Sequence, residues 1–145
     1  MLVSNVMKTD VKTGNENQDV MAVCKVMYDN DIGCVVVIKE QGKDKIPVGI
    51  ITERDIIRKI GSVELFTTQT PIRELMSSNI ISIKPHNTIS DAVRIMHGND
   101  IRRLPVIDND GKMIGIITDK DILKAIARKS SIASAYISRG FEVED

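Results

Sequence analysis

The sequence predicts a mixed α/β (α+β) fold made of two repeats, each with the element order β-α-β-β-α, packed sheet to sheet with approximate twofold symmetry. The first observation is a repeated motif, because GIITERD at residues 49–55 returns as GIITDKD at residues 115–121. The second is that matched segments continue on both sides of this motif. The third is a hydrophobic spacing that alternates between helical and strand-like within each repeat. A unit of about 60 residues buries too little surface to be stable alone, so we expect the two repeats to pair.

The repeats align in two long blocks with different separations. VGIITERDIIRKI (Val48–Ile60) matches IGIITDKDILKAI (Ile114–Ile126) at a separation of 66 residues. MYDNDIGCVVVI (Met27–Ile38) matches MHGNDIRRLPVI (Met96–Ile107) at a separation of 69 residues. The first repeat therefore carries three extra residues in KEQGKDKIP, between the two blocks. We expect them at a hairpin tip, where insertions are tolerated.

The first half of each repeat predicts a short strand and then a helix. The strands are expected near Asp10–Thr13 and Ile80–Lys84. Asp19 and Thr88 follow and are suitable helix N-caps. Apolar residues then recur at helical spacing: Val20, Val23, Cys24 and Met27 in the first repeat, and Ile89, Ala92, Val93 and Met96 in the second.

The second half of each repeat predicts two strands and another helix. Cys34–Ile38 and Leu104–Ile107 are short runs rich in β-branched residues, which is typical of buried strands. The DNDG sequence at 108–111 is a turn signal that leads into a strand at Met113–Ile117. After Thr52 and Thr118 the apolar spacing becomes helical again. We therefore divide the chain into repeat 1 (1–60), a linker (61–71), repeat 2 (72–128) and a C-terminal tail (129–145).

Composition disfavours several classes of function. Twenty basic and twenty acidic residues give a formal net charge of zero, which argues against a general nucleic-acid or anionic-membrane binder. Two tyrosines, two phenylalanines and no tryptophan leave few rings for base stacking. No long apolar run predicts a membrane span or a signal peptide, so we expect a cytoplasmic protein. The two cysteines and two histidines lack metal-ligand spacing, so we expect no metal and no resident cofactor.

The doubled motif, the NDIRRLPVID block at 99–108 and the openings VMKT (6–9) and LMSS (75–78) resemble CBS domains. These are the small repeats named after cystathionine β-synthase, and two of them form a Bateman module. The resemblance covers about residues 1–128. It implies a stand-alone pair that binds an adenosine-type ligand such as AMP, ADP, ATP or S-adenosylmethionine. It also implies a regulatory sensor rather than a catalyst.

The chemistry of the motif agrees with that implication. Each glycine lets a backbone or ring approach closely because it has no Cβ. Each threonine lies where a strand becomes a helix, so its hydroxyl and the free N–H groups of the first turn suit a phosphate. Each aspartate can accept hydrogen bonds from the two hydroxyls of a ribose. The residues concerned are Thr52, Asp55, Thr118 and Asp121. T-x-x-D is also a helix-capping pattern, and we retain capping as a second role.

Arg102 and Arg103 stand where repeat 1 has Gly33 and Cys34. One interpretation is a solvated pair of charges at the edge of a strand. Neighbouring strand residues point to opposite faces, however, so each arginine could serve a different site. The resemblance implies that Arg103 reaches phosphates beside Thr118 and that Arg102 leans toward the site of Thr52.

The resemblance further implies that each site borrows residues from the region of the first strand of the other repeat. These are Met76, Ile80, Ile81 and Pro85 for the site of Thr52 and Asp55, and Met7, Val11 and Lys12 for the site of Thr118 and Asp121. The apolar members of both sets would serve equally as core residues.

We therefore predict a regulatory module that binds an adenine nucleotide between its repeats, forms a homodimer through its helices and signals to a separate protein. One alternative is a structural dimerisation module whose clefts are vestigial. Another is a sensor of S-adenosylmethionine or NAD. An enzyme is disfavoured because no nucleophile–base pair, paired carboxylates or metal cluster stands out.

Overall fold

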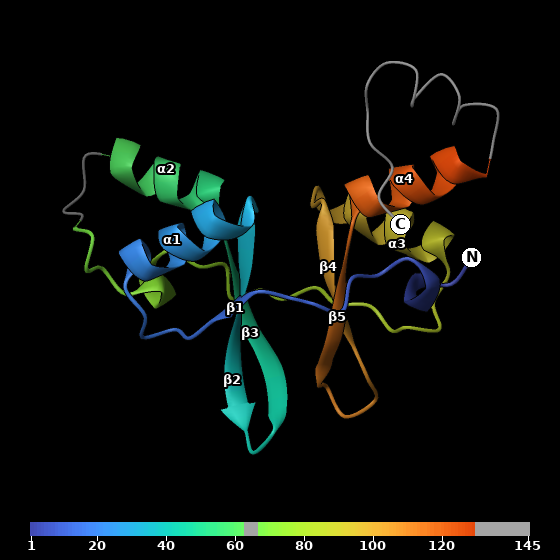
Figure 1. The fold of residues 1–145 in the computed structure, drawn as a ribbon, viewed down its shortest axis with the longest axis horizontal. Helices are drawn as coiled ribbons and strands as arrows, with labels where there is room; N and C mark the ends of the chain where they lie inside the picture. Colours follow the sequence, from blue (N-terminus) through green and yellow to red (C-terminus); the bar gives the residue numbers. More distant parts are fainter. Residues whose placement is uncertain (63–66, 130–145) are drawn as a thin grey trace. The chain divides into compact units, whose positions relative to one another are not determined.

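The computed structural model describes residues 1–62 and 67–129, and it has the predicted mixed α/β character (Figure 1). The C-terminal tail from residue 130 onward lies outside the described residues. The elements are, in chain order, η1 (Val3–Asn5), β1 (Thr13–Gly14), α1 (Val20–Asn30), β2 (Cys34–Gln41), β3 (Asp44–Thr52), α2 (Glu53–Gly61), η2 (Ile72–Glu74), α3 (Ile89–Asn99), β4 (Arg103–Ile107), β5 (Met113–Thr118) and α4 (Asp119–Arg128). No helix in these two ranges is long and apolar enough to cross a membrane.

The compact units do not follow chain order. One unit contains the N-terminal segment Met1–Thr9, residues Ser82–Asp108 and the described residues 114–129. The other contains Asp10–Ile81 with Asn109–Met113. The first nine residues therefore belong with repeat 2, and the segment that opens repeat 2 belongs with repeat 1. We call these the α3–α4 unit and the α1–α2 unit.

The α1–α2 unit is built on a three-stranded sheet in the order β1-β2-β3. β1 runs parallel to β2, and β2 pairs antiparallel with β3 from Cys34↔Thr52 to Gln41↔Asp44. The hairpin turns at Gly42, whose φ of 64° is easily adopted by a residue without Cβ. β2 and β3 have eight and nine residues, against five and six in β4 and β5. The insertion thus lengthens this hairpin, as predicted.

One core cluster joins the helices of this unit to its sheet. Val20, Val23 and Met27 of α1 form part of it, as the helical spacing predicts. Alternate strand residues Val35 and Val37 belong to the same cluster, as expected for side chains on one face of a sheet. Ile51, Ile56 and Ile72 complete its buried members. Ile72 is fully buried, so η2 is part of this core although it follows the linker.

The α3–α4 unit has a two-stranded sheet of β4 and β5. The strand predicted at Ile80–Lys84 is wrong in extent, because only Ile83 forms a bridge, parallel to Val106. The equivalent residue pair in repeat 1 is Gly14↔Val37, and a second pair, Thr13↔Val36, extends the parallel pairing in that repeat. Repeat 2 has Pro105 in place of Val36, and a proline has no N–H to donate to the next rung. One substitution therefore accounts for the lost strand. In repeat 1 the strand is also displaced, since β1 overlaps the predicted Asp10–Thr13 only at Thr13.

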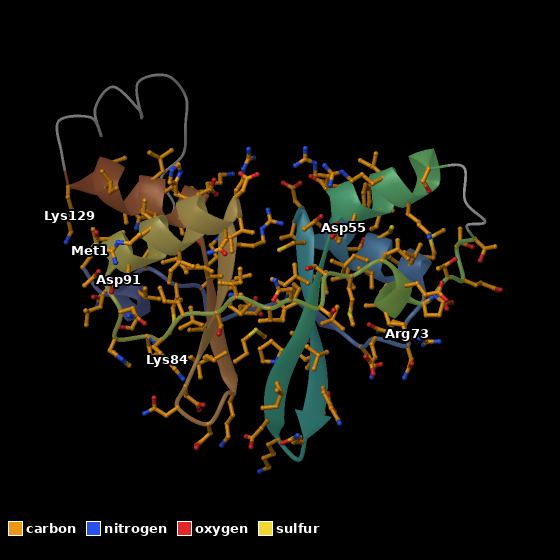
Figure 2. The ribbon with its side chains drawn as sticks, turned by 180° about the vertical axis from the view of Figure 1, so that it is seen from behind. Met1, Asp55, Arg73, Lys84, Asp91 and Lys129 are labelled. Carbon is orange, nitrogen blue, oxygen red and sulfur yellow. The ribbon has the colours of Figure 1, made fainter. Side chains whose placement is uncertain are left out.

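Hydrogen bonds from the side chains of Arg73 and Lys84 hold the connecting segments on each unit (Figure 2). Arg73 of η2 donates a hydrogen bond of 2.7 Å from Nη1 to Oδ1 of Asn17. Lys84 donates one of 2.8 Å from Nζ to the carbonyl of Asp108. Each bond lies within one unit, so each holds a connecting segment in place on its own unit.

Candidate functional site

The second motif forms a closed corner between β5 and α4. Thr118 is the N-cap of α4, and its Oγ1 accepts a hydrogen bond of 3.1 Å from the N–H of Asp121. The N–H of Thr118 donates in return to Oδ2 of Asp121 at 3.1 Å. This reciprocal pair is a capping box, so the capping role of T-x-x-D is confirmed. It fixes the Asp121 carboxylate at the start of the helix.

The first motif forms the same corner between β3 and α2. The N–H of Asp55 donates to Oγ1 of Thr52 at 3.1 Å, and the N–H of Thr52 donates to Oδ2 of Asp55 at 2.9 Å. The Thr52 hydroxyl also donates to that Oδ2 at 2.9 Å. No such bond ties the Thr118 hydroxyl proton to a residue of the described ranges. A hydroxyl that keeps its proton available is better placed to donate to a phosphate.

The glycine of each motif admits the backbone of a segment from elsewhere in the chain. A Cβ on Gly115 would lie 2.8 Å from the carbonyl oxygen of Lys8 and 2.8 Å from Sδ of Met7. A Cβ on Gly49 would lie 2.5 Å from Sδ of Met76. Lys8 exchanges two backbone hydrogen bonds of 2.9 Å with Ile116. In the other unit, Ser77 exchanges two of the same length with Ile50.

The structure thus brings Met7 to the strand that ends in Thr118, and Met76 to the strand that ends in Thr52. Their contact with a ligand stays a prediction. Ile80 and Ile81 lie in the α1–α2 unit with Thr52 and Asp55. Pro85 lies in the α3–α4 unit, where its carbonyl accepts from the N–H of Ser4 at 3.0 Å. Val11 and Lys12 belong to the α1–α2 unit, whereas Thr118 and Asp121 belong to the α3–α4 unit. Their roles, and that of Pro85, stay predictions.

Arg102 and Arg103 lie beside the second motif in the α3–α4 unit. The carbonyl of Arg102 accepts from the N–H of Asp119, in the first turn of α4, at 2.9 Å. The equivalent bond in the other unit joins the N–H of Glu53 to the carbonyl of Gly33 at 3.0 Å. The two repeats therefore match at this point, as their alignment predicts. Arg103 begins β4 and is half-buried.

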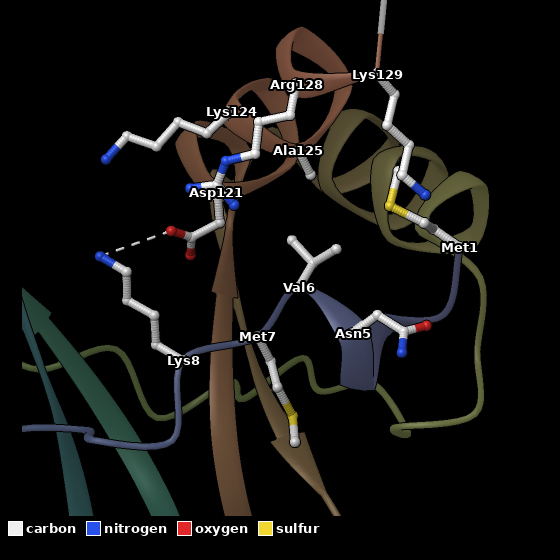
Figure 3. Close-up of a pocket in the computed structure, with 10 residues that line it drawn as sticks. All are labelled: Met1, Asn5, Val6, Met7, Lys8, Asp121, Lys124, Ala125, Arg128 and Lys129. Atoms are coloured by element: carbon white, nitrogen blue, oxygen red, sulfur yellow. Dashed lines mark ion pairs between the residues drawn. The ribbon is translucent and has the colours of Figure 1, made fainter. Parts of the chain in front are cut away.

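A pocket of about 720 Å³ opens beside α4 (Figure 3). Its polar side chains include Lys8, Asp121, Lys124, Arg128 and Lys129. The N-terminal segment supplies Met1, Asn5, Val6 and Met7, and α4 supplies Ala125. All ten residues belong to the α3–α4 unit.

Asp121 is the buried anion of this pocket. Its side chain is 7% exposed, and its Oδ1 lies 3.7 Å from Nζ of Lys8, whose side chain is 58% exposed. That separation is an ion pair rather than a short hydrogen bond. Since a carboxylate has about four acceptor positions, Oδ1 retains the capacity to accept from a ligand hydroxyl.

The sequence reasoning missed the cations of the pocket. Lys124 and Arg128 follow Asp121 at i+3 and i+7, a spacing that places them on the same helix face and could have indicated them. No sequence pattern indicated Lys8, because Asp121, with which it forms an ion pair, is far away in the sequence. No group of histidine, cysteine, aspartate or glutamate in the described ranges could hold a metal ion.

A family model for the CBS domain matches residues 3–62 and again residues 72–128. The chain belongs to the CBS-domain family. It is 38% identical over 122 residues to an uncharacterised protein of Methanopyrus kandleri, a match that covers 84% of this chain and 61% of that protein. The chain thus spans less than two thirds of that relative. It is 32% identical over 133 residues to the CBS domain-containing protein YhcV of Bacillus subtilis, covering 92% of this chain and 91% of that protein.

Solved CBS domain pairs have the same fold. The CBS domain pair of protein MJ0100, in complex with 5′-methylthioadenosine and S-adenosyl-L-methionine, superposes with a TM-score of 0.78. That chain is 25% identical, and the match covers 90% of this chain and 98% of that one. The resemblance to a CBS domain pair and the mixed α/β fold class are therefore both confirmed.

Proposed function

We propose that this CBS domain pair is a regulatory module that binds an adenosine-type ligand through the Thr-x-x-Asp corners of its repeats. The observation that carries the proposal is the buried carboxylate of Asp121, held by the capping box at the head of α4 and facing a pocket. Among the described residues, one of its oxygens has only a 3.7 Å contact, with Nζ of Lys8. A ribose offers two adjacent hydroxyl donors to such an acceptor. The two adenosine compounds bound by the CBS pair of protein MJ0100 support the same ligand class.

The ligand would act by shifting a population. A ligand that binds one arrangement of the two units better than another stabilises that arrangement, and a separate protein can then recognise it. Dimerisation fits this scheme. Apolar side chains of α2 and α4 are exposed, among them Ile57 at 67%, Ile60 at 57%, Leu123 at 47% and Ile126 at 43%. These residues are candidates to be covered by a second copy of the chain.

The same exposed helices favour a second candidate, a structural dimerisation module that binds no ligand. Thermal shift measurements separate the two. A ligand that binds only the folded state raises the melting temperature with concentration, as mass action requires. A dimerisation module would instead melt at a temperature that rises with protein concentration and ignores AMP, ATP and S-adenosylmethionine.

The sharper test of the proposal is Asp121→Ala. We expect adenosine ligands to bind it more weakly by roughly 1.5–3 kcal/mol, the range for hydrogen bonds to a charged group. Calorimetry with a ligand and its 2′,3′-dideoxy analogue measures the effect. The analogue should bind the wild type and the variant about equally. If the variant still prefers the ribose form, Asp121 is not the ribose acceptor.

A further inference from the structure

The pocket beside α4 has an apolar wall. Met1, Val6 and Met7 of the N-terminal segment and Ala125 of α4 supply it. Met1 is 46% exposed, and Val6 and Met7 are half-buried. Covering such surface with apolar side chains is favourable, because it removes the surface from water. The pocket therefore favours an occupant that brings apolar side chains of its own.

Three exposed cations line the rim of the same pocket, and we call them the rim cations. The side chains of Arg128 and Lys129 have no hydrogen bond or ion pair with another described residue. Lys8 is 58% exposed, and its ion pair with Asp121 has a separation of 3.7 Å. Figure 3 shows Lys129 and Met1 at one end of the pocket, and Lys8 and Asp121 at the other. The favoured occupant is therefore anionic as well as apolar.

The chain itself contains a segment with this chemistry. Residues 130–145 read SSIASAYISRGFEVED, and they lie outside the described residues. They include Tyr136 and Phe141, two of the four aromatic residues of the chain. Three acidic residues at positions 142–145 and one arginine at position 139 give the segment a net charge of −2. The segment is thus apolar and anionic, which complements the wall and the rim cations.

Covalent attachment keeps this segment close to the pocket. Lys129 lines the pocket, and residue 130 follows it directly. The distance along α4 from Asp121 to Lys129 is about 12 Å at 1.5 Å per residue. About four extended residues span that distance, so the segment is long enough to return along the whole pocket. A short tether gives an effective concentration in the mM range, so weak contacts are sufficient for binding.

We propose that residues 130–145 bind within their own chain to the pocket beside α4. Their acidic residues pair with the rim cations, and their apolar and aromatic residues cover the apolar wall. A segment bound there covers Asp121, so it competes with the ligand of that site and makes the site autoinhibited. The competition rests on the proposed function, whereas the binding of the segment rests on the chemistry of the pocket and of the segment.

Cross-linking of the full chain by a carbodiimide tests the binding of the segment. This reagent joins an amine directly to a carboxylate, so it links only groups that meet. We expect a link between Lys8 and an acidic residue at 142–145, which lies far from Lys8 in the sequence. Lys25 and Lys43 are the controls, because both are exposed lysines of the α1–α2 unit. Mass spectrometry of mixed light and heavy isotope-labelled protein separates links within one chain from links between two chains.

Three results would overturn the binding of the segment. The first is the absence of a link to Lys8. The second is a link to Lys25 or Lys43 with the same yield, because the reaction would then be unselective. The third is a link to Lys8 that forms only between chains, because the occupant would then be a second copy.

Calorimetry with adenosine tests the competition. One triple variant neutralises the acidic residues of the segment: Glu142→Gln, Glu144→Gln and Asp145→Asn. The matched control neutralises three exposed acidic residues of the α1–α2 unit: Glu16→Gln, Asp29→Asn and Glu74→Gln. Adenosine is uncharged, so the change in net charge does not by itself alter its affinity.

We expect the segment variant to bind adenosine about three- to tenfold more tightly than the wild type, the scale of a few solvent-screened ion pairs. The control should bind adenosine like the wild type. High salt should raise the affinity of the wild type toward that of the segment variant, because salt screens the pairs that hold the segment. Equal adenosine affinity in the wild type and the segment variant would overturn the competition.

The proposed function and the bound segment fail in different ways. If adenosine binds and no link to Lys8 forms, the proposed function stands and the bound segment is wrong. If the link to Lys8 forms within one chain and adenosine binds to neither the wild type nor the segment variant, the bound segment stands and the adenosine-type ligand is wrong.

Discussion

At the scale of single residues, the aspartate of each Thr-x-x-Asp motif takes part in the helix cap and also offers a carboxylate oxygen as a hydrogen-bond acceptor. In both corners the aspartate uses Oδ2 to accept the N–H of the threonine. In the second corner Oδ1 contacts only Lys8 among the described residues. Capping therefore engages one oxygen and leaves the other for a ligand, so the two interpretations of the motif are compatible. A third capping box, Thr88 with Asp91 at the head of α3, lies on no candidate site and shows the capping role alone.

That third box makes a prediction about pH. The N–H of Thr88, followed by Asn87 and the Thr88 hydroxyl, lowers the pKa of Asp91 below its ordinary value of 3.8. A carboxyl group with a lowered folded-state pKa stabilises the protein above its unfolded pKa, and this contribution disappears as the pH falls through the folded value. We expect Asp91→Asn to be less stable than wild type at neutral pH, with the difference vanishing in acid. Urea denaturation from pH 7 down to about 2 measures this difference in stability.

The same substitution at exposed Asp29 is the control, and an identical pH profile for both variants would contradict the prediction.

A second prediction at this scale concerns Arg103. Its guanidinium has no hydrogen bond or ion pair with another described residue, and it lies in the same unit as Thr118. We expect Arg103→Ala to weaken ATP and ADP more than adenosine, because charge-assisted bonds to phosphate are lost while sugar contacts remain. Calorimetry of ATP and adenosine at two salt concentrations measures the difference. Equal losses for the two ligands would mean that Arg103 supports the fold and contacts no phosphate.

At the scale of elements, each strand of the motif depends on a segment from elsewhere in the chain. The glycines at 49 and 115 are the contact points, since a Cβ at either would collide with a methionine side chain. At Gly115 it would also meet the backbone carbonyl of Lys8, which cannot rotate away. The glycine of the motif is therefore a packing requirement of the fold, before any ligand is considered.

We accordingly expect Gly115→Ala to destabilise the protein by about 1–3 kcal/mol, the usual cost of overpacking. Gly98→Ala is the matched control, because Gly98 lies in α3 and a Cβ there would have no atom within 4 Å. Since alanine favours a helix more than glycine does, the control should be stabilised by roughly 0.5–1 kcal/mol. Chemical denaturation compares the two variants. Similar free energies of unfolding for both would refute the steric argument.

At the scale of the whole molecule, the two compact units exchange their opening segments. Residues 1–9 belong with repeat 2, and the segment that contains Ile72 and Met76 belongs with repeat 1. The predicted boundary at residue 60 therefore separates repeat 1 from part of its own core. Whether the repeats pack sheet to sheet with twofold symmetry stays a prediction.

This exchange predicts how fragments behave. A fragment of residues 1–66 should be unfolded or self-associated, because it lacks the fully buried Ile72 and exposes an apolar sheet face. A fragment of residues 10–81 retains that core and should show more residual structure. Circular dichroism and ultracentrifugation of both fragments measure the difference. A monomeric 1–66 fragment that melts cooperatively would contradict the exchange of segments.

The features that depend on short-range pattern could be predicted from the amino-acid sequence. The repeat, the helices and the β2–β3 and β4–β5 hairpins follow from hydrophobic spacing, and the Thr-x-x-Asp corners follow from a motif of seven residues. These are local properties, since helix spacing and capping are decided within one or two turns. Three features required the folded structure: which segment packs on which repeat, the interruption of strand pairing at Pro105, and the ion pair of Lys8 with Asp121. Such contacts join residues far apart in the chain, and contacts over long sequence separations produce no periodic pattern in the sequence. The charge of the candidate pocket therefore could not be predicted from the sequence, because the N-terminal segment and α4 supply it together.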